Sequence, residues 1–157
     1  KKERAAAKAE REGEKTENFV KDILAELNPE KGKLVKILKW ADLDTEEYKK
    51  MTTILYDEFE KNEKFQNEII EIVKESVNSD ILSNIDCKKL AVYVLEELPF
   101  LICGVKYDGI LYNLLPYPGI SKIDYLTVAL QEGMLFPEIS RRLGIKNKMR
   151  YIETYVQ

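Results

Sequence analysis

The sequence predicts an α/β fold in which helices cover a parallel or mixed β-sheet. Apolar residues at helical spacing alternate along the chain with short runs of β-branched and aromatic residues, which are typical of strands. Proline and glycine separate these segments. The chain has 157 residues, of which 45% are hydrophobic, and this is enough for one domain with a substantial core. Strands that alternate with helices favour a layered arrangement of the two.

The N-terminal part is expected to form a helix and then a strand. Residues 1–17 are rich in Ala, Glu, Lys and Arg, which are the best helix formers. Apolar residues then recur at helical spacing up to Leu27, so the same helix is expected to turn toward the core. Pro29 and Gly32 end it. Residues 34–40 include β-branched and aromatic members, and they predict a strand.

Two amphipathic helices are predicted next, over residues 45–61 and 63–77. Asp44 followed by Glu47 matches an N-terminal capping pattern for the first of them. The side chains expected to be buried recur at helical spacing in both helices. They are Tyr48, Met51, Leu55 and Phe59 in the first helix, and Phe65, Ile69, Ile72 and Val73 in the second.

The segment after Asp86 predicts a buried helix that stops near Pro99. It is apolar nearly all round, which marks a central helix. Tyr93 and Glu97 lie one turn apart in it, so the phenol and the carboxylate point the same way. A carboxylate inside such a helix is costly unless it is paired or used. The two residues are therefore either a satisfied pair at the edge of the core or a site that handles an amino group and its protons.

Turns and caps divide the C-terminal part into two strands and two helices. Residues 107–109 predict a turn, and residues 110–117 predict a buried strand that Pro118 closes. Ser121 with Asp124 caps a helix that runs to about residue 132, where Gly133 stops it. A short helical turn over residues 136–143 ends at Gly144, and residues 151–156 predict a final strand.

The charge composition excludes several classes of function. The chain carries 25 Lys and Arg, 28 Asp and Glu and no histidine, which gives a net charge of -3. It therefore lacks the global positive charge of a dedicated nucleic-acid binder. The absence of histidine excludes Ser-His and Cys-His mechanisms and His-ligated zinc. Any proton transfer must use carboxylates, tyrosines, lysines or the substrate itself.

Several motifs are missing from the sequence. It has no glycine-rich phosphate loop, no nucleophile elbow and no metal-binding spacing of cysteines or carboxylates, so neither a metal nor a cofactor is expected. Cys87 and Cys103 are too few for a disulfide framework. Cys103 is a candidate thiol nucleophile before Gly104, but its apolar surroundings are expected to raise its pKa.

Positive charge gathers in two local clusters. The first is a stripe along the predicted N-terminal helix, with steps of three or four residues and glutamates between them. It consists of Lys1, Arg4, Lys8, Arg11 and Lys15. The stripe is either a solvated helix face or a contact for nucleic-acid phosphates. The second cluster, without an acid among its members, consists of Arg141, Arg142, Lys146, Lys148 and Arg150.

Two motifs together resemble the tRNA-dependent cyclodipeptide synthases. They are Tyr-x-x-x-Glu-x-Pro-Phe at residues 93–100 and Leu-Leu-Pro-Tyr-Pro at residues 114–118. The upstream order of a basic helix, a strand and a helix pair is also similar to that family, and the resemblance covers essentially the whole chain. It implies a Rossmann-like three-layer sandwich with a mostly parallel sheet, similar to the catalytic domain of class I tyrosyl- and tryptophanyl-tRNA synthetases. It also implies an aminoacyltransferase that joins the aminoacyl groups of two aminoacyl-tRNAs, through an acyl-enzyme, into a cyclic dipeptide (a 2,5-diketopiperazine).

The resemblance gives roles to three catalytic candidates. Tyr93 and Glu97 match the positions that hold the α-amino group of the bound aminoacyl moiety. Tyr117 matches a tyrosine implicated in proton transfer at cyclisation, and Pro118 is similar to the subfamily that carries Tyr-Pro here.

The resemblance also implies binding residues. Phe100 and Leu115 fall where the family lines its first aminoacyl pocket, and Asn78 matches an asparagine of the second pocket. The stripe of Lys1 to Lys15 matches a basic helix that binds tRNA phosphates. Two aminoacyl-tRNAs are therefore the expected partners, and the enzyme is expected to need no cofactor.

The nucleophilic serine of the family lies in an N-terminal portion that has no counterpart in this sequence. Because the chain opens at Lys1 inside a helix-forming run, we expect residues 1–157 to be a partial single domain, the later portion of a longer cyclodipeptide synthase. This segment alone is expected to form no cyclodipeptide.

Other properties are expected from the sequence as a whole. No apolar run approaches the ~20 residues of a membrane span and no signal-peptide pattern is present, so we expect no membrane contact. With only two cysteines we expect a cytoplasmic protein, and the charges without a conspicuous exposed apolar stripe favour a monomer. A non-enzymatic α/β module that binds RNA or a protein remains the alternative. In that case Tyr93, Glu97 and Tyr117 are ordinary residues at the edge of the core.

Overall fold

The computed structural model describes residues 2–27, 30, 45–76, 86–117 and 121–153. The chain divides into two compact units, Lys1–Trp40 and Ala41–Gln157. In the first unit, α1 (Lys2–Leu27) confirms the predicted helix and its end. The expected turn of α1 toward a core is wrong for Phe19, whose side chain is 65% exposed. The predicted strand at residues 34–40 lies outside the described residues.

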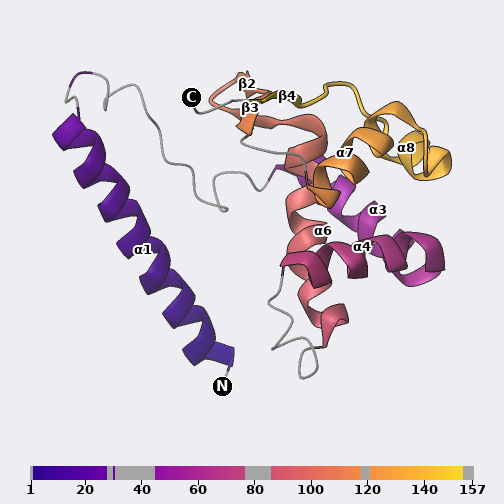
Figure 1. Cartoon of the computed structure of the whole chain (residues 1–157), viewed down its shortest axis with the longest axis horizontal. Coiled ribbons are helices and arrows are strands. Elements are labelled where there is room, and N and C mark those ends of the chain that lie inside the picture. The colour runs from indigo at the N-terminus through magenta and orange to yellow at the C-terminus, as the bar shows by residue number, and fades with distance from the viewer. Residues whose placement is uncertain (1, 28–29, 31–44, 77–85, 118–120, 154–157) are drawn as a thin grey trace. The chain divides into compact units, whose positions relative to one another are not determined.

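Five helices dominate the described part of the second unit. They are α3 (Glu46–Lys61), α4 (Glu63–Ser76), α6 (Cys87–Cys103), α7 (Lys122–Glu132) and α8 (Pro137–Leu143). Figure 1 shows α6 in the middle of this unit, with the strands beyond its C-terminal end. It contacts α3, α4 and α7, while α8 contacts α3 and α7. The prediction of a central helix in this segment is therefore confirmed.

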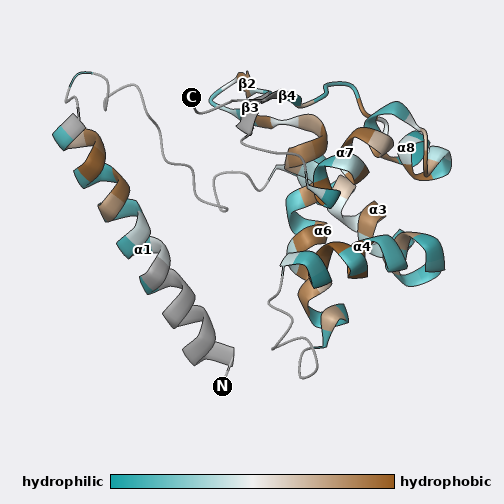
Figure 2. Ribbon diagram, viewed as in Figure 1, coloured by the Kyte–Doolittle hydropathy of each residue, from teal (hydrophilic) through white to brown (hydrophobic). Residues whose placement is uncertain are grey.

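One apolar core joins these helices. Figure 2 shows hydrophobic residues along much of α6, where the neighbouring helices meet it. All the residues predicted to be buried in α3 and α4 belong to the core except Tyr48, which is half-buried. The fully buried large side chains of the core include Leu55, Phe65, Ile69, Leu95, Leu98, Ile102, Leu130 and Ile139.

The predicted α/β fold is wrong for the described residues, as is the Rossmann-like three-layer sandwich with a mostly parallel sheet. The strands form two separate two-stranded sheets. In one, β1 (Val105–Tyr107) pairs antiparallel with β2 (Ile110–Tyr112), and in the other, β3 (Leu114–Tyr117) pairs parallel with β4 (Arg150–Glu153). These strands have three or four residues each, too few to bury a sheet face. The apolar side chains at helical spacing pack against one another instead.

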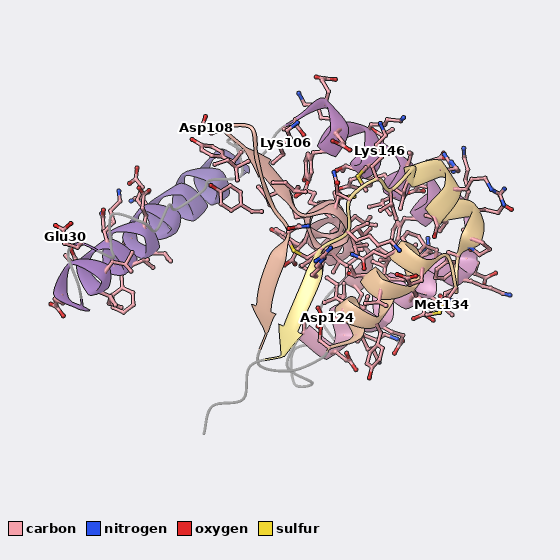
Figure 3. The ribbon with its side chains drawn as sticks, turned by 90° about the horizontal axis from the view of Figure 1, so that it is seen from above. Glu30, Lys106, Asp108, Asp124, Met134 and Lys146 are labelled. Carbon is pink, nitrogen blue, oxygen red and sulfur yellow. The ribbon has the colours of Figure 1, made fainter. Side chains whose placement is uncertain are left out.

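The long buried strand predicted at residues 110–117 is also wrong. The segment breaks at Asn113, so that β2 and β3 belong to different sheets, and the β2 side chains are exposed. The turn before it is confirmed: Asp108 and Gly109 both have positive φ angles, 50° and 77°. Two such residues form the tight turn that suits a two-residue hairpin. Asp108 is labelled at the tip of this hairpin in Figure 3.

The predicted stop near Pro99 is wrong, because α6 continues to Cys103. Proline removes one helical hydrogen bond. Leu98, Pro99 and Ile102 are nonetheless all buried, so the apolar face continues past the proline and helical packing outweighs the lost bond.

Most of the helix ends predicted from capping residues are confirmed. Thr45 caps α3, since its Oγ1 accepts a hydrogen bond from the Tyr48 amide at 3.2 Å, whereas the predicted cap, Asp44, lies outside the described residues. The capping pair of Ser121 and Asp124 is confirmed at the start of α7. Gly133 and Gly144 adopt the left-handed conformation that ends α7 and α8, as predicted.

The end of α6 requires a glycine at position 104. Gly104 has a φ of +78° and a ψ of -175°, a region that is essentially restricted to glycine. A Cβ there would lie 2.6 Å from the carbonyl oxygen of Tyr112. We expect Gly104→Ala to lower the free energy of unfolding by about 2–4 kcal/mol, measured by urea denaturation. Gly109→Ala is the matched control, because its φ is also positive but nothing lies within 4 Å of the added methyl. Equal losses in the two variants would contradict the clash.

Candidate functional site

Two successive glutamates on α6 point to different neighbours. Adjacent residues on a helix are separated by about 100°. Glu96 interacts with α3, through Tyr48 and Tyr56, whereas the carboxyl of Glu97 lies within electrostatic reach of Asp124 on α7. The two acids therefore belong to two distinct sites, although they are neighbours in the sequence.

The Glu96 side of α6 contains a tyrosine cluster that sequence reasoning missed. The hydroxyl of Tyr48 donates a hydrogen bond to the backbone carbonyl of Glu96 at 3.1 Å, and the Glu96 carboxyl lies close enough for its charge to act on the Tyr56 hydroxyl. Burial, followed by the negative charge of Glu96, raises the pKa of Tyr56. The cluster joins residues that lie far apart in the sequence, and no local pattern signals such a contact. It links α6 to α3 beside the apolar contacts of the core.

The predicted pair Tyr93 and Glu97 lies on the exposed side of α6. The Tyr93 side chain is 68% exposed, and Glu97 is also exposed as a residue. Partial desolvation of the Glu97 carboxyl, followed by the negative charge of Asp124, raises its pKa. This arrangement presents a phenol and a carboxylate to solvent, one turn apart, on the exposed side of a helix whose opposite side is buried. Such a pair can bind a cationic amino group and accept a proton from it.

Phe100 lines a small hollow near the end of α6, bordered by the start of α3 and by the β1–β2 hairpin. Its ring stacks on Tyr48, with centroids 4.5 Å apart and an interplanar angle of 16°. The interior volume is about 50 Å³. Ligand pockets usually have ~300–1,000 Å³, so the hollow in this form does not accommodate an aminoacyl side chain.

Cys103 lines the same hollow and is a poor nucleophile. Its Sγ lies 3.7 Å from the Sδ of Met51. Burial, with a smaller contribution from the charge of Glu47, raises the pKa of the thiol from 9.0 to about 11. The expectation of a raised pKa is therefore confirmed, and the physical cause is the apolar packing at the end of α6.

We expect iodoacetamide to alkylate Cys103 about tenfold more slowly than an ordinary thiol near pH ~8. The raised pKa lowers the thiolate fraction about 100-fold, and the stronger nucleophilicity of a more basic thiolate offsets about a tenfold part of this. A Cys87→Ser variant isolates Cys103, and mass spectrometry follows the reaction, with the urea-unfolded variant as the reference. A native rate equal to the unfolded rate would contradict the assigned environment.

The remaining predicted site residues are only partly described. Tyr117 and Leu115 lie on β3, opposite Glu153 and Tyr151 of β4, but their side chains lie outside the description. Asn78 and Pro118 lie outside the described residues altogether. Tyr93 and Glu97 thus share one helix face, while no described contact joins them to the other candidates.

The predicted basic stripe falls on α1. Four of its five members belong to this helix: Arg4, Lys8, Arg11 and Lys15. Their spacing of three or four residues places them along one side of the helix. Lys1 lies outside the described residues. The side chains of Arg11 and Lys15 are exposed.

Three members of the second basic cluster form ion pairs, two of them with acids from other helices. Arg142 forms ion pairs with Asp57, at 2.7 Å, and with Glu58. Lys148 pairs with Glu132 at 2.8 Å, and Arg141 pairs with Glu138 at 2.5 Å. The absence of acids within the segment itself was therefore misleading, because the fold supplies them.

Neither a scan against protein-family models nor a search of curated proteins finds a match to the chain.

Among the described residues, no helix has the length and apolar character needed to cross a membrane. The same residues contain no group of three or more cysteines or acids placed to hold a metal ion.

Proposed function

We propose that this chain is the amino-group-binding portion of a tRNA-dependent cyclodipeptide synthase. The observation that carries the proposal is the joint exposure of Tyr93 and Glu97 on the exposed side of α6, the helix whose opposite side lies in the core. The multi-stranded, mostly parallel sheet that the resemblance implies is not found in the described residues, whose one parallel pair is β3 with β4. The proposal therefore rests on this pair of α6 side chains and on the two sequence motifs. The substrates are two aminoacyl-tRNAs, and the product is a 2,5-diketopiperazine.

The chemistry needs a group that binds an amino nitrogen and removes its proton. The α-ammonium of an aminoacyl ester has a pKa near ~8, so it is largely charged at neutral pH. The Glu97 carboxylate attracts this cation and then accepts a proton, which leaves a free amine. The amine attacks an ester carbonyl, a C–N bond forms, and the C–O bond to the leaving hydroxyl breaks. The raised pKa of Glu97 makes its carboxylate a better base for this step than an ordinary glutamate.

Tyr93 suits the same step, because its hydroxyl can accept a hydrogen bond from the ammonium group and thereby orient it. The absence of histidine from the chain leaves carboxylates and phenols as the proton carriers. The serine that would carry the acyl group is expected outside this sequence.

The basic stripe on α1 suits a tRNA substrate. Positive side chains along one helix face can bind successive phosphates. Arg11 and Lys15 are exposed and lie one turn apart. Aminoacyl-tRNA is a cytoplasmic substrate, which is consistent with a protein that works there.

The test is expression, in a bacterium, of the full-length gene in which this chain is encoded, with mass spectrometry of the medium. We expect a cyclic dipeptide that is absent from the control culture. The purified full-length protein should form the same product from aminoacyl-tRNA without ATP, whereas residues 1–157 alone should form none. A folded, purified full-length protein that leaves aminoacyl-tRNA intact would contradict the proposal and favour the alternative of a non-enzymatic binding module.

A further inference from the structure

We infer that α1 carries a docking face for a basic amphipathic helix of a partner protein. The apolar face of α1 lies in its last turns and consists of Phe19, Val20, Ile23, Leu24 and Leu27. Steps of three or four residues place these positions on one side of the helix. None of them belongs to α6, so the inference does not depend on the proposed function.

The described side chains of this face are open to solvent to different degrees. Phe19 is 65% exposed and Ile23 is 37% exposed, while Val20 and Leu24 are half-buried. Figure 2 shows hydrophobic residues gathered toward the C-terminal end of α1. Adjacent exposed apolar side chains are typical of a surface that binds a protein. The expectation that the chain has no conspicuous exposed apolar stripe is therefore wrong for this helix.

The spacing of uncharged residues along α1 predicts that the partner is a helix. In a heptad, written abcdefg, positions a and d face the partner helix. From Ala6 to Leu27 these positions hold no charged residue, although charged residues are frequent in α1. Position a is taken by Ala6, Gly13, Val20 and Leu27, and position d by Ala9, Thr16 and Ile23. Three successive heptads of this kind are typical of helix pairing. A Cβ added at Gly13 would have nothing within 4 Å, so there is open space beside this position.

The residues that flank positions a and d determine the charge of the partner. Positions e and g lie beside them and meet the side chains of the facing helix. In α1 the charged residues at e and g are all acidic: Glu3, Glu10, Glu12, Glu17 and Glu26. Two copies of α1, parallel or antiparallel, would bring glutamate against glutamate, which opposes pairing. A partner helix with lysine or arginine at these positions is complementary.

One of these acids already has a neighbour of opposite charge. Glu17 forms an ion pair with Lys21, one turn later, at 2.6 Å. An exposed pair of this kind contributes little stability. The carboxylate of Glu17 can therefore exchange Lys21 for a lysine of the partner at little cost.

The basic stripe lies on another side of α1. Arg4, Lys8, Arg11 and Lys15 occupy positions c and f, which point away from a and d. A helix bound to the apolar face therefore leaves the stripe accessible, and α1 can bind a protein and nucleic-acid phosphates at the same time.

The test is titration of the purified chain with a synthetic three-heptad peptide that has leucine at a and d and lysine at e and g. A peptide with glutamate at e and g is the ligand control. Calorimetry should show binding of the basic peptide only, and added NaCl should weaken it, because the flanking charges are exposed.

Two pairs of variants assign the binding to this face. We expect Ile23→Asp to raise the Kd at least about tenfold, whereas Ala25→Asp, at an exposed f position, should retain the wild-type Kd. Glu17→Lys with Glu26→Lys should raise the Kd about tenfold and reverse its dependence on salt. Glu14→Lys with Asp22→Lys makes the same change of charge at positions b and c and should have little effect. Circular dichroism should show an unchanged helix content in all four variants.

Three results would overturn the inference. Equal affinity for the acidic peptide, or equal losses in the two pairs of lysine variants, would mean that the flanking glutamates do not select the partner. A dimer in sedimentation velocity that Ile23→Asp dissociates would assign the face to a second copy of the chain. Absence of binding by the basic peptide, in a chain whose α1 is helical, would reject a helical partner.

Discussion

Replacing Glu97 with glutamine is expected to lower the rate of cyclic dipeptide formation by about 10²–10⁴-fold. Glutamine has nearly the same shape, but it carries no negative charge to attract the ammonium group and cannot accept its proton. The measurement is the initial rate of diketopiperazine formation from aminoacyl-tRNA by the purified full-length protein, followed by mass spectrometry. Circular dichroism should show an unchanged fold, because Glu97 lies on the exposed side of α6.

Glu96→Gln is the matched control for this variant. It removes the same charge one residue earlier, on the side of α6 where Glu96 meets Tyr56 rather than Asp124. We expect it to retain most of the activity and to lose some stability through the weakened contact with Tyr56. If Glu96→Gln abolished product formation and Glu97→Gln did not, the reactive face of α6 would be the one that meets α3.

The helices were predictable because each depends on local signals. Apolar spacing located α3 and α4, and Ser121, Gly133 and Gly144 marked helix ends that the structure confirms. The end of α6 was not predictable in this way. The stop expected at Pro99 depended on a local rule, whereas Ile102 is buried by contacts that form only in the folded chain.

The prediction of a larger sheet was wrong for a related reason. A short apolar run such as residues 110–117 satisfies the pattern of a buried strand, but the pattern does not say which partner the strand finds. In the structure its two halves join different sheets, on either side of Asn113. The Asp108-Gly109 dipeptide signalled a hairpin, and giving it more weight would have predicted β1 and β2 as a local pair.

The candidate site, too, was predictable only where it depends on local sequence. The spacing of Tyr93 and Glu97 was visible in the sequence, because both belong to one helix. The neighbours of the two acids, Tyr56 for Glu96 and Asp124 for Glu97, come from other helices. Local patterns carry no information on such contacts. They require knowledge of how α6 is rotated between α3 and α7.

Replacing Leu98 with alanine tests that rotation and is expected to lower the free energy of unfolding by about 3–4 kcal/mol. Leu98 is 0% exposed, and the substitution leaves a cavity in the core that α6 shares with its neighbours. Urea denaturation should show a lower midpoint with an unchanged m-value, and the melting temperature should fall by about 10 °C.

Val92→Ala is the control on the same helix, because its side chain is 37% exposed and should change stability by no more than about 0.5 kcal/mol. Leu98 directly follows Glu97 but points into the core. The full-length Leu98→Ala protein, assayed well below its melting temperature, should therefore still form the cyclic dipeptide at nearly the wild-type rate. Equal stability losses at Leu98 and Val92 would mean that α6 is rotated differently, and the assignment of Glu97 to the exposed face would fail with it.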